Sequence, residues 1–174
     1  MRSMNANPTR ELTRLAPALL VAVSAALLLG ALGFQYLGGL KPCALCIWQR
    51  YPHGAVLVLG ALALGHALAG KPKAVPWLTM LAAVAMIVGA GIAAFHVGVE
   101  QGWWKGLEAC AAGSRPPGTL EGAFEALKKG PAASCSDIPW QLFGISMAGY
   151  NFLISAAVGI FGLAATRAMV RRAA

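Results

Sequence analysis

Four long stretches of the chain contain no Asp, Glu, Lys or Arg, and they constrain its fold more than any other feature. They span residues 15–40, 51–70, 74–99 and 138–166. About 20 apolar residues are enough to cross the hydrocarbon core of a bilayer, and a helix is the open-chain structure that satisfies its own backbone there. We therefore predict four transmembrane helices, near residues 16–37, 46–69, 75–98 and 144–166.

The composition favours a membrane protein over a soluble one. Hydrophobic residues make up 58% of the chain and charged residues 11%, whereas ordinary globular domains are roughly a quarter charged. The formal charge is +8, but the basic residues are neither interleaved with aromatics nor gathered in one stripe, so no nucleic-acid partner is predicted. We predict an all-α membrane protein with one integral membrane domain, residues 1–174. A cleaved signal peptide is the alternative for the first stretch, although that stretch is longer than the roughly 7–15 apolar residues of a signal.

Four helices place both termini on one side of the membrane, and the two sides differ in charge. The terminal side has a net charge of +7 and the other side +1. Lys and Arg near membrane ends favour the cytoplasm, so the termini are predicted to be cytoplasmic and all four cysteines to lie outside. The terminal side holds Arg2, Arg10, Arg14, Lys71, Lys73, Arg167, Arg171, Arg172 and Glu11, and the other side holds Lys41, Arg50, Lys105, Arg115, Lys128, Lys129, Glu100, Glu108, Glu121, Glu125 and Asp137.

The one long outer loop, about residues 99–143, contains its own predicted features. Trp103, Trp104 and Trp140 are typical of interfacial anchors. Residues 119–129 show the spacing of a short amphipathic helix, which would lie flat on the membrane. A solvated helix is the alternative for this segment.

The cysteines form two groups, Cys43 with Cys46 and Cys110 with Cys135. Four cysteines permit three pairings, and the simplest joins each group internally. Disulfides persist outside the cytoplasm. A structural disulfide is a serious alternative for Cys110–Cys135, and a zinc site remains a minor one, whereas a c-type haem is excluded because Ile47 follows the second cysteine where that motif requires His.

The spacing of Cys43 and Cys46 favours redox chemistry. C-x-x-C is the spacing at which a thiolate and its partner exchange a disulfide readily, and these cysteines fall near the predicted start of the second helix, whose positive end favours a thiolate. Arg50 follows Cys46 by four residues and stays protonated at any working pH. It would stabilise negative charge on a thiolate or on an apolar cofactor. The alternative for Arg50 is a snorkelling interfacial cation.

Residues 40–50, LKPCALCIWQR, closely resemble the signature of the disulfide bond formation protein B (DsbB) family of inner-membrane thiol oxidases. The resemblance extends over nearly the whole chain: four predicted spans, a C-x-x-C motif opening the second helix and a second cysteine pair in the second outer loop. The residue before Arg50 is acidic in some members. It is Gln49 here, and we assign that side chain no catalytic part.

The resemblance implies a protein-disulfide:quinone oxidoreductase of the bacterial inner membrane that sustains disulfide bond formation in the periplasm. Cys110 and Cys135 would oxidise a soluble, thioredoxin-like dithiol partner similar to DsbA. The electrons would pass to Cys43 and Cys46 and then to a quinone, either ubiquinone or menaquinone. Arg50 would face the quinone oxygens, and Cys46 would form the thiolate that contacts the quinone.

The histidines are weaker candidates for the same site. His96 lies near the outer end of the third predicted helix and is a candidate for protonating reduced quinone. His53, one turn beyond Arg50, is a candidate for the quinone site or a proton path, whereas His66 is assigned to packing. Two other classes remain open: a vitamin K epoxide reductase-like enzyme, and a non-enzymatic membrane scaffold stapled by its disulfides.

Overall fold

The structure is a computed structural model that describes residues 8–107, 110, 119, 121 and 133–173. Within these residues, four helical spans are long and apolar enough to cross a membrane, which confirms the predicted four-helix transmembrane bundle. The helices and strands are α1 (Pro8–Tyr36), α2 (Ala44–Trp48), α3 (Arg50–Leu68), the 3-10 helix η1 (Pro72–Ala74), α4 (Val75–Glu100), β1 (Gln141–Leu142), β2 (Ile145–Ser146) and α6 (Met147–Ala173).

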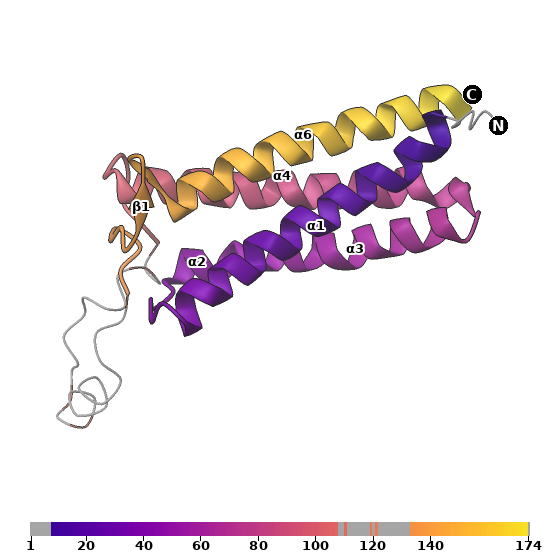
Figure 1. The fold of residues 1–174 in the computed structure, drawn as a ribbon. Helices are drawn as coiled ribbons and strands as arrows, with labels where there is room; N and C mark the ends of the chain where they lie inside the picture. Colours follow the sequence, from indigo (N-terminus) through magenta and orange to yellow (C-terminus); the bar gives the residue numbers. More distant parts are fainter. Residues whose placement is uncertain (1–7, 108–109, 111–118, 120, 122–132, 174) are drawn as a thin grey trace.

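The helices run along one another, with both termini at one end of the bundle and α2 and β1 at the other (Figure 1). Helix α4 packs against α3 and α6, and α1 packs against the same two helices. Small residues allow the close approach. A Cβ added at Gly60 would come within 2.7 Å of Val21, and one at Gly162 within 2.8 Å of Ala83. These two glycines therefore serve helix packing.

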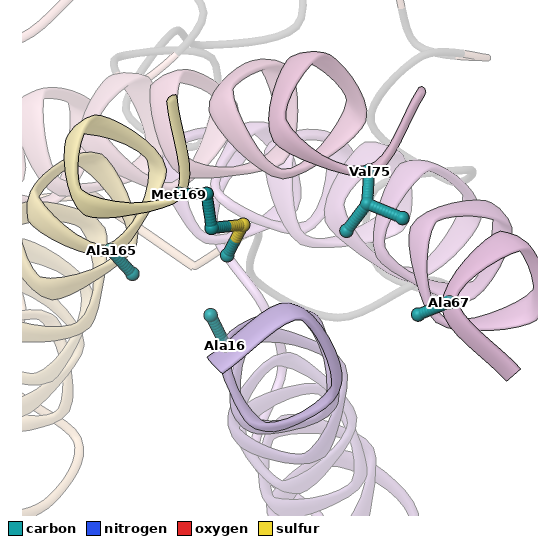
Figure 2. Close-up of a cluster of buried hydrophobic side chains, with 5 residues drawn as sticks. All are labelled: Ala16, Ala67, Val75, Ala165 and Met169. Carbon is teal, nitrogen blue, oxygen red and sulfur yellow. The ribbon is translucent and has the colours of Figure 1, made fainter. Parts of the chain in front are cut away.

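A small apolar core closes the end of the bundle that carries the termini. Figure 2 shows the side chain of Met169 on α6 reaching between the helices toward Ala16 on α1. Met169 is 1% exposed and Ala16 is fully buried. This core holds four helices together at the end opposite the cysteines. Its members are Ala16, Ala67, Val75, Ala165 and Met169.

The second span is divided into α2 and α3 by a local break at Gln49. The backbone of Gln49 is still helical, with φ −63° and ψ −22°, so the two helices continue in nearly the same direction. Pro52 explains the break, because proline has no N–H to donate to the carbonyl of Trp48 four residues earlier. The break lies directly beside Cys46 and Arg50.

A tight hairpin precedes the last span and was not predicted from the sequence. Strands β1 and β2 pair antiparallel, with Leu142 opposite Ile145. The two residues between them, Phe143 and Gly144, have φ values of 50° and 76°, as in the type I′ turns that favour two-residue hairpins. Helix α6 therefore begins at Met147, three residues later than predicted. The amphipathic helix predicted at 119–129 lies outside the described residues apart from 119 and 121.

Candidate functional site

The C-x-x-C motif lies at the beginning of α2. Cys43 is the residue that caps this helix, and its sulfur accepts a hydrogen bond from the backbone N–H of Cys46 at 3.3 Å. Both cysteines are thiols in this structure, and their sulfurs lie 2.8 Å apart. The hydrogen bond to Cys46, together with burial, raises the pKa of the Cys43 thiol well above its usual range. The geometry therefore brings two reactive sulfurs within reach of each other.

The second cysteine pair packs against the first. Cys110 and Cys135 form a disulfide with their Cα atoms 5.2 Å apart. Both are buried in one cluster with Cys43, Leu45 and Val99, which we call the sulfur cluster. Cys110 is 5% exposed and Cys135 is fully buried. The structure thus places the loop disulfide next to Cys43, while the pairing of Cys43 with Cys46 stays a prediction.

A cavity of about 520 Å³ lies beside the motif and is lined by both of its cysteines. Its walls come from α1, α2, α3, α4, α6 and the segment before β1. Cys46 and Arg50 both line it, and much of the remaining wall is apolar, including Phe34 and Trp140. Their rings are in contact, with centroids 5.1 Å apart. A predominantly apolar cavity with a few polar groups is typical of a small-molecule site.

Two polar atoms in the cavity wall have no hydrogen-bond partner among the described residues. They are Nε of Arg50, a donor, and Oε1 of Gln35, an acceptor. Buried polar groups are nearly always hydrogen-bonded in proteins. A ligand with polar atoms of its own would satisfy both of these atoms, one on α1 and one on α3.

Both candidate histidines are buried and both line the cavity, His53 from α3 and His96 from α4. Nε2 of His96 lies 3.6 Å from the sulfur of Cys43 and 3.9 Å from Oε1 of Glu100. His66 is half-buried near the other end of α3. The structure therefore brings His53 and His96 to the site and leaves His66 away from it. Their roles in proton transfer or quinone binding stay predictions.

A chain of side-chain hydrogen bonds connects the two buried histidines. Gln49 lies 2.8 Å from Nδ1 of His96, and its Oε1 accepts from Asn151 at 2.6 Å. Asn151 in turn contacts Nε2 of His53 at 2.9 Å. Nδ1 of His53 lies 3.3 Å from the hydroxyl of Ser24. Four spans thus contribute to one buried polar network, which we call the amide–histidine chain.

Most of this network was not predicted from the sequence. Gln49 was assigned no catalytic part, and Asn151 and Ser24 were not among the candidate residues. One signal was present, because an isolated polar residue within a transmembrane span is costly unless it has a partner or a function. The partners themselves come from helices far apart in sequence, so residue spacing could not identify them.

The same site has the geometry of a small metal-binding cluster. One ligand atom from each of Cys43, Cys46 and His96 lies within 4.8 Å of the other two. Structural zinc sites hold four ligands in a tetrahedron. A thiophilic metal is therefore a geometric alternative for this trio, and zinc stays the minor alternative that the sequence predicted.

Comparison with known proteins identifies the family. The family model described as "Disulfide bond formation protein DsbB" matches residues 13–165. The chain is 31% identical to "Disulfide bond formation protein B" of Verminephrobacter eiseniae (strain EF01-2) over 90% of this chain and 87% of that one.

Two further relatives with the same description are similar over most of their length. The identity is 30% for Polaromonas sp. (strain JS666 / ATCC BAA-500), over 89% of this chain and 91% of that one. It is 32% for Methylobacillus flagellatus (strain ATCC 51484 / DSM 6875 / VKM B-1610 / KT), over 76% and 80%. No solved structure matches the chain significantly. This chain, a multi-pass membrane protein with two cysteine pairs at one end of its bundle, belongs to the DsbB family of disulfide bond formation proteins.

Proposed function

We propose that the protein is a membrane thiol oxidase that connects a soluble dithiol to a membrane quinone. One observation carries the proposal: the C-x-x-C pair borders both the loop disulfide and the cavity. Cys43 is buried in the sulfur cluster with the loop disulfide and Cys46 packs against that cluster, while both cysteines line the cavity together with Arg50. Electrons that enter through the loop pair can therefore leave through the cavity.

In the first transfer, the dithiol of a soluble, thioredoxin-like partner similar to DsbA reduces the Cys110–Cys135 disulfide. Two partner thiols become a disulfide, and the loop disulfide becomes two thiols. Both loop cysteines are buried beside Cys43. This buried position corresponds to the stage at which the loop pair reacts with Cys43. The soluble partner reacts at a different stage, when the loop pair lies outside the sulfur cluster.

In the second transfer, the loop pair reduces the oxidised C-x-x-C pair. A loop thiolate attacks the sulfur of Cys43, which lies in the same cluster, and Cys46 departs as the thiolate. The second loop cysteine then displaces Cys43, so that the loop disulfide forms again and Cys43 is released as a thiol. One disulfide is exchanged for another, and two electrons move to the motif at the cavity.

The cavity residues fit a quinone as the electron acceptor, either ubiquinone or menaquinone. The unpaired Nε of Arg50 can donate to a carbonyl oxygen, and the side-chain amide of Gln35 offers a second polar contact across the cavity. Phe34 and Trp140 provide aromatic surface for a flat ring. A quinone held there would accept the two electrons and two protons released when Cys43 and Cys46 close to a disulfide.

An acceptor of this kind is needed because the soluble partner is itself a strong oxidant. For a two-electron couple, every 30 mV uphill costs about 1.4 kcal/mol, so a chain of thiols alone would stall. A relay from soluble oxidase through a membrane protein to quinone is the established scheme of the family. What this chain adds is the placement of each cysteine relative to the loop and the cavity.

We further propose that the protein lies in a bacterial inner membrane with both termini cytoplasmic and the cysteines periplasmic. The charge difference between the two ends supports this orientation, and both termini lie at the end of the bundle away from α2 (Figure 1), which Cys43 caps. A membrane-impermeant maleimide added to intact, reduced cells should label Cys110 and Cys135. Labelling of these cysteines from the cytoplasmic side alone would contradict the orientation.

Turnover by purified protein tests the function directly. Reduced thioredoxin-like partner and quinone are mixed with the protein, and quinone reduction is followed by absorbance. We expect turnover with the wild type and none with Cys43→Ser or Cys46→Ser. A scaffold would show no turnover in any of the three proteins. A vitamin K epoxide reductase-like enzyme would instead reduce quinone epoxides, so the absence of epoxide reduction separates that alternative.

A further inference from the structure

We propose that Gln49 and Asn151 are positioning residues that hold His96 in the tautomer with its hydrogen on Nε2, so that a one-way chain of hydrogen bonds ends at Cys46. Under this arrangement, Cys46 carries the negative charge of the reduced pair and Cys43 keeps the proton. The inference rests on the proposed function for its consequence, because that function already has Cys46 as the thiolate beside the electron acceptor; the new part is how Gln49 and Asn151 direct the charge to it. The geometry itself stands independently of that function.

The direction of the chain is fixed by a backbone carbonyl. The side-chain nitrogen Nε2 of Gln49 lies 3.2 Å from the carbonyl oxygen of Leu45. A carbonyl oxygen can only accept a hydrogen bond, so the amide must present its NH₂ group on this side. The same NH₂ group lies 2.8 Å from Nδ1 of His96. Nδ1 is therefore an acceptor and carries no hydrogen.

The other side of the Gln49 amide fixes Asn151 in the same way. Oε1 of Gln49 is an acceptor, so the atom 2.6 Å away on Asn151 must be its NH₂ group. The oxygen of Asn151 then faces the hydroxyl of Ser155 and Nε2 of His53, each at 2.9 Å. Ser155 is fully buried and donates to this oxygen. Both amides thus have one orientation that satisfies every contact, and a flip of either would place like groups against each other.

His96 passes this direction on to the cysteines. With no hydrogen on Nδ1, a neutral imidazole carries it on Nε2, and Nε2 faces the sulfur of Cys43 and the carboxylate of Glu100. Both of these groups can accept it. The backbone carbonyl of Cys135 also interacts with the ring. The NH₂ group of Gln49 therefore faces Nδ1 of His96 as a donor, whereas acceptors surround the rest of the ring.

The sulfur of Cys43 is the next member of the chain. It accepts from the backbone N–H of Cys46 at 3.3 Å and faces Nε2–H of His96 at 3.6 Å. With its lone pairs engaged, its own S–H is directed to the sulfur of Cys46, 2.8 Å away. Cys46 is then the acceptor at the end of the chain, beside Arg50 in the cavity wall. Each donor from Asn151 to Cys43 keeps its own hydrogen, so this chain of hydrogen bonds orients its members without transferring a proton.

The tautomer can be measured without turnover. Side-chain ¹³C and ¹⁵N shifts of histidine distinguish the two tautomers, and His96→Gln identifies the signal in reduced, full-length protein in nanodiscs. We expect Nε2–H for His96 in the wild type. In Gln49→Glu, the carboxylate accepts from Nδ1–H and the proton moves to that nitrogen. A hydrogen on Nδ1 in the wild type, or an unchanged tautomer in Gln49→Glu, would overturn the proposal.

Alkylation of the reduced protein reports which sulfur carries the charge. Iodoacetamide labelling from pH 6 to 9, read by mass spectrometry, gives the ratio of modified Cys46 to modified Cys43. Gln49→Glu should shift this ratio toward Cys43 by about tenfold, the effect of losing one hydrogen bond to a charged group. Asn151→Leu, which removes the neighbour that orients Gln49, should shift it in the same direction by a smaller factor. Groups that also influence the profile are Cys46 on α2, Arg50 on α3, Glu100 on α4, and Lys41 and Asp137 in the cavity wall.

Gln101→Glu is the matched control. Gln101 is exposed at the end of α4, so this substitution adds the same charge at the same end of the bundle without contacting His96. It should leave both the tautomer and the labelling ratio unchanged. An equal shift in the control, or no shift in Gln49→Glu and Asn151→Leu, would contradict the chain. The outcome is independent of the proposed function, because a protein that fails to reduce quinone can still show the tautomer and the ratio.

Discussion

The indole of Trp104 lies directly on Gly98, and its Nε1 donates a 3.0 Å hydrogen bond to the backbone carbonyl of Phe95. The ring also stacks on the Phe95 side chain, with centroids 5.7 Å apart. Gly102, with a φ of 70°, reverses the chain after α4 and makes this return possible. The Trp104 side chain therefore holds the segment that follows α4 against the last turns of that helix, next to the sulfur cluster.

The first prediction concerns this contact. A Cβ at residue 98 would overlap the indole ring, so Gly98→Ala should displace Trp104 and destabilise the protein by about 1–3 kcal/mol, as overpacking does elsewhere. Thermal unfolding in detergent measures the loss, and limited proteolysis measures the exposure of residues 101–107. Gly91→Ala is the control on the same helix, because a Cβ there meets no described atom within 4 Å. Equal stability of the two variants would show that the Trp104 contact is unimportant.

The second prediction concerns the mixed disulfide of the relay. In Cys46→Ser, Cys43 stays a thiol and can attack the Cys110–Cys135 disulfide, so that one loop cysteine leaves as a thiol. Because the variant lacks the motif's second sulfur, which would displace the loop cysteine, a Cys43 disulfide to Cys110 or Cys135 should accumulate in oxidised membranes. The shared sulfur cluster makes this bond accessible without large movement. Peptide mapping under non-reducing conditions detects it. If Cys43→Ser accumulates a Cys46 disulfide to the loop instead, then Cys46, and not Cys43, is the cysteine that exchanges with the loop pair.

The third prediction concerns Arg50. Its guanidinium lines the cavity with an unpaired Nε, so Arg50→Met should raise the KM for quinone about tenfold, equivalent to about 1.4 kcal/mol. Arg50→Lys keeps the charge but loses the planar fork and should raise the KM less. Single-turnover oxidation of the soluble partner by pre-oxidised protein should change little in either.

Arg167→Lys serves as the matched control for Arg50→Lys, because Arg167 is exposed on α6 far from the cysteines. Its quinone kinetics should be those of the wild type. Normal quinone kinetics combined with slow partner oxidation in the Arg50 variants would assign Arg50 to anchoring at the membrane interface.

The fourth prediction concerns the pH dependence of Cys43. Its pKa is raised by the hydrogen bond to Cys46 and by burial, so the thiol should stay protonated through the range where ordinary cysteines, with pKa about 8.5, ionise. Alkylation of Cys43 in the reduced protein should therefore remain slow up to pH 9. In the unfolded chain, Cys43 loses its proton at a lower pH than in the folded protein. The stability of the reduced protein should therefore fall as the pH rises past the ordinary cysteine pKa of about 8.5. Equal alkylation rates in folded and detergent-denatured protein at pH 9 would contradict the raised pKa.

Much of the fold was predictable because charge-free stretches report directly on membrane spans. The helix ends were predicted less well, since polar residues can extend a span beyond the bilayer: α1 begins at Pro8, and α6 continues past Arg167 to Ala173. The hairpin before α6 escaped prediction because strands of two residues are too short to show an alternating pattern.

The candidate site was predictable in its sulfurs and less so in its polar groups. Cys43, Cys46 and Arg50 follow one another at helical spacing, so the sequence alone places them together. Gln49 and Asn151 are separated by 102 residues and meet only because the junction of α2 and α3 borders the same cavity as α6. No local pattern carries such a pairing.

The C-x-x-C turn also bears on how such a protein can diverge under the proposed function. The soluble partner would meet Cys110, Cys135 and the segments that carry them, whereas the cavity wall comes largely from α1, α3 and α6. The two regions share Ala133, Ser134 and Asp137, which lie beside Cys135 in the chain and also line the cavity. A lineage that changes its electron acceptor can therefore substitute residues of the three helices, whereas a substitution beside Cys135 would affect both regions.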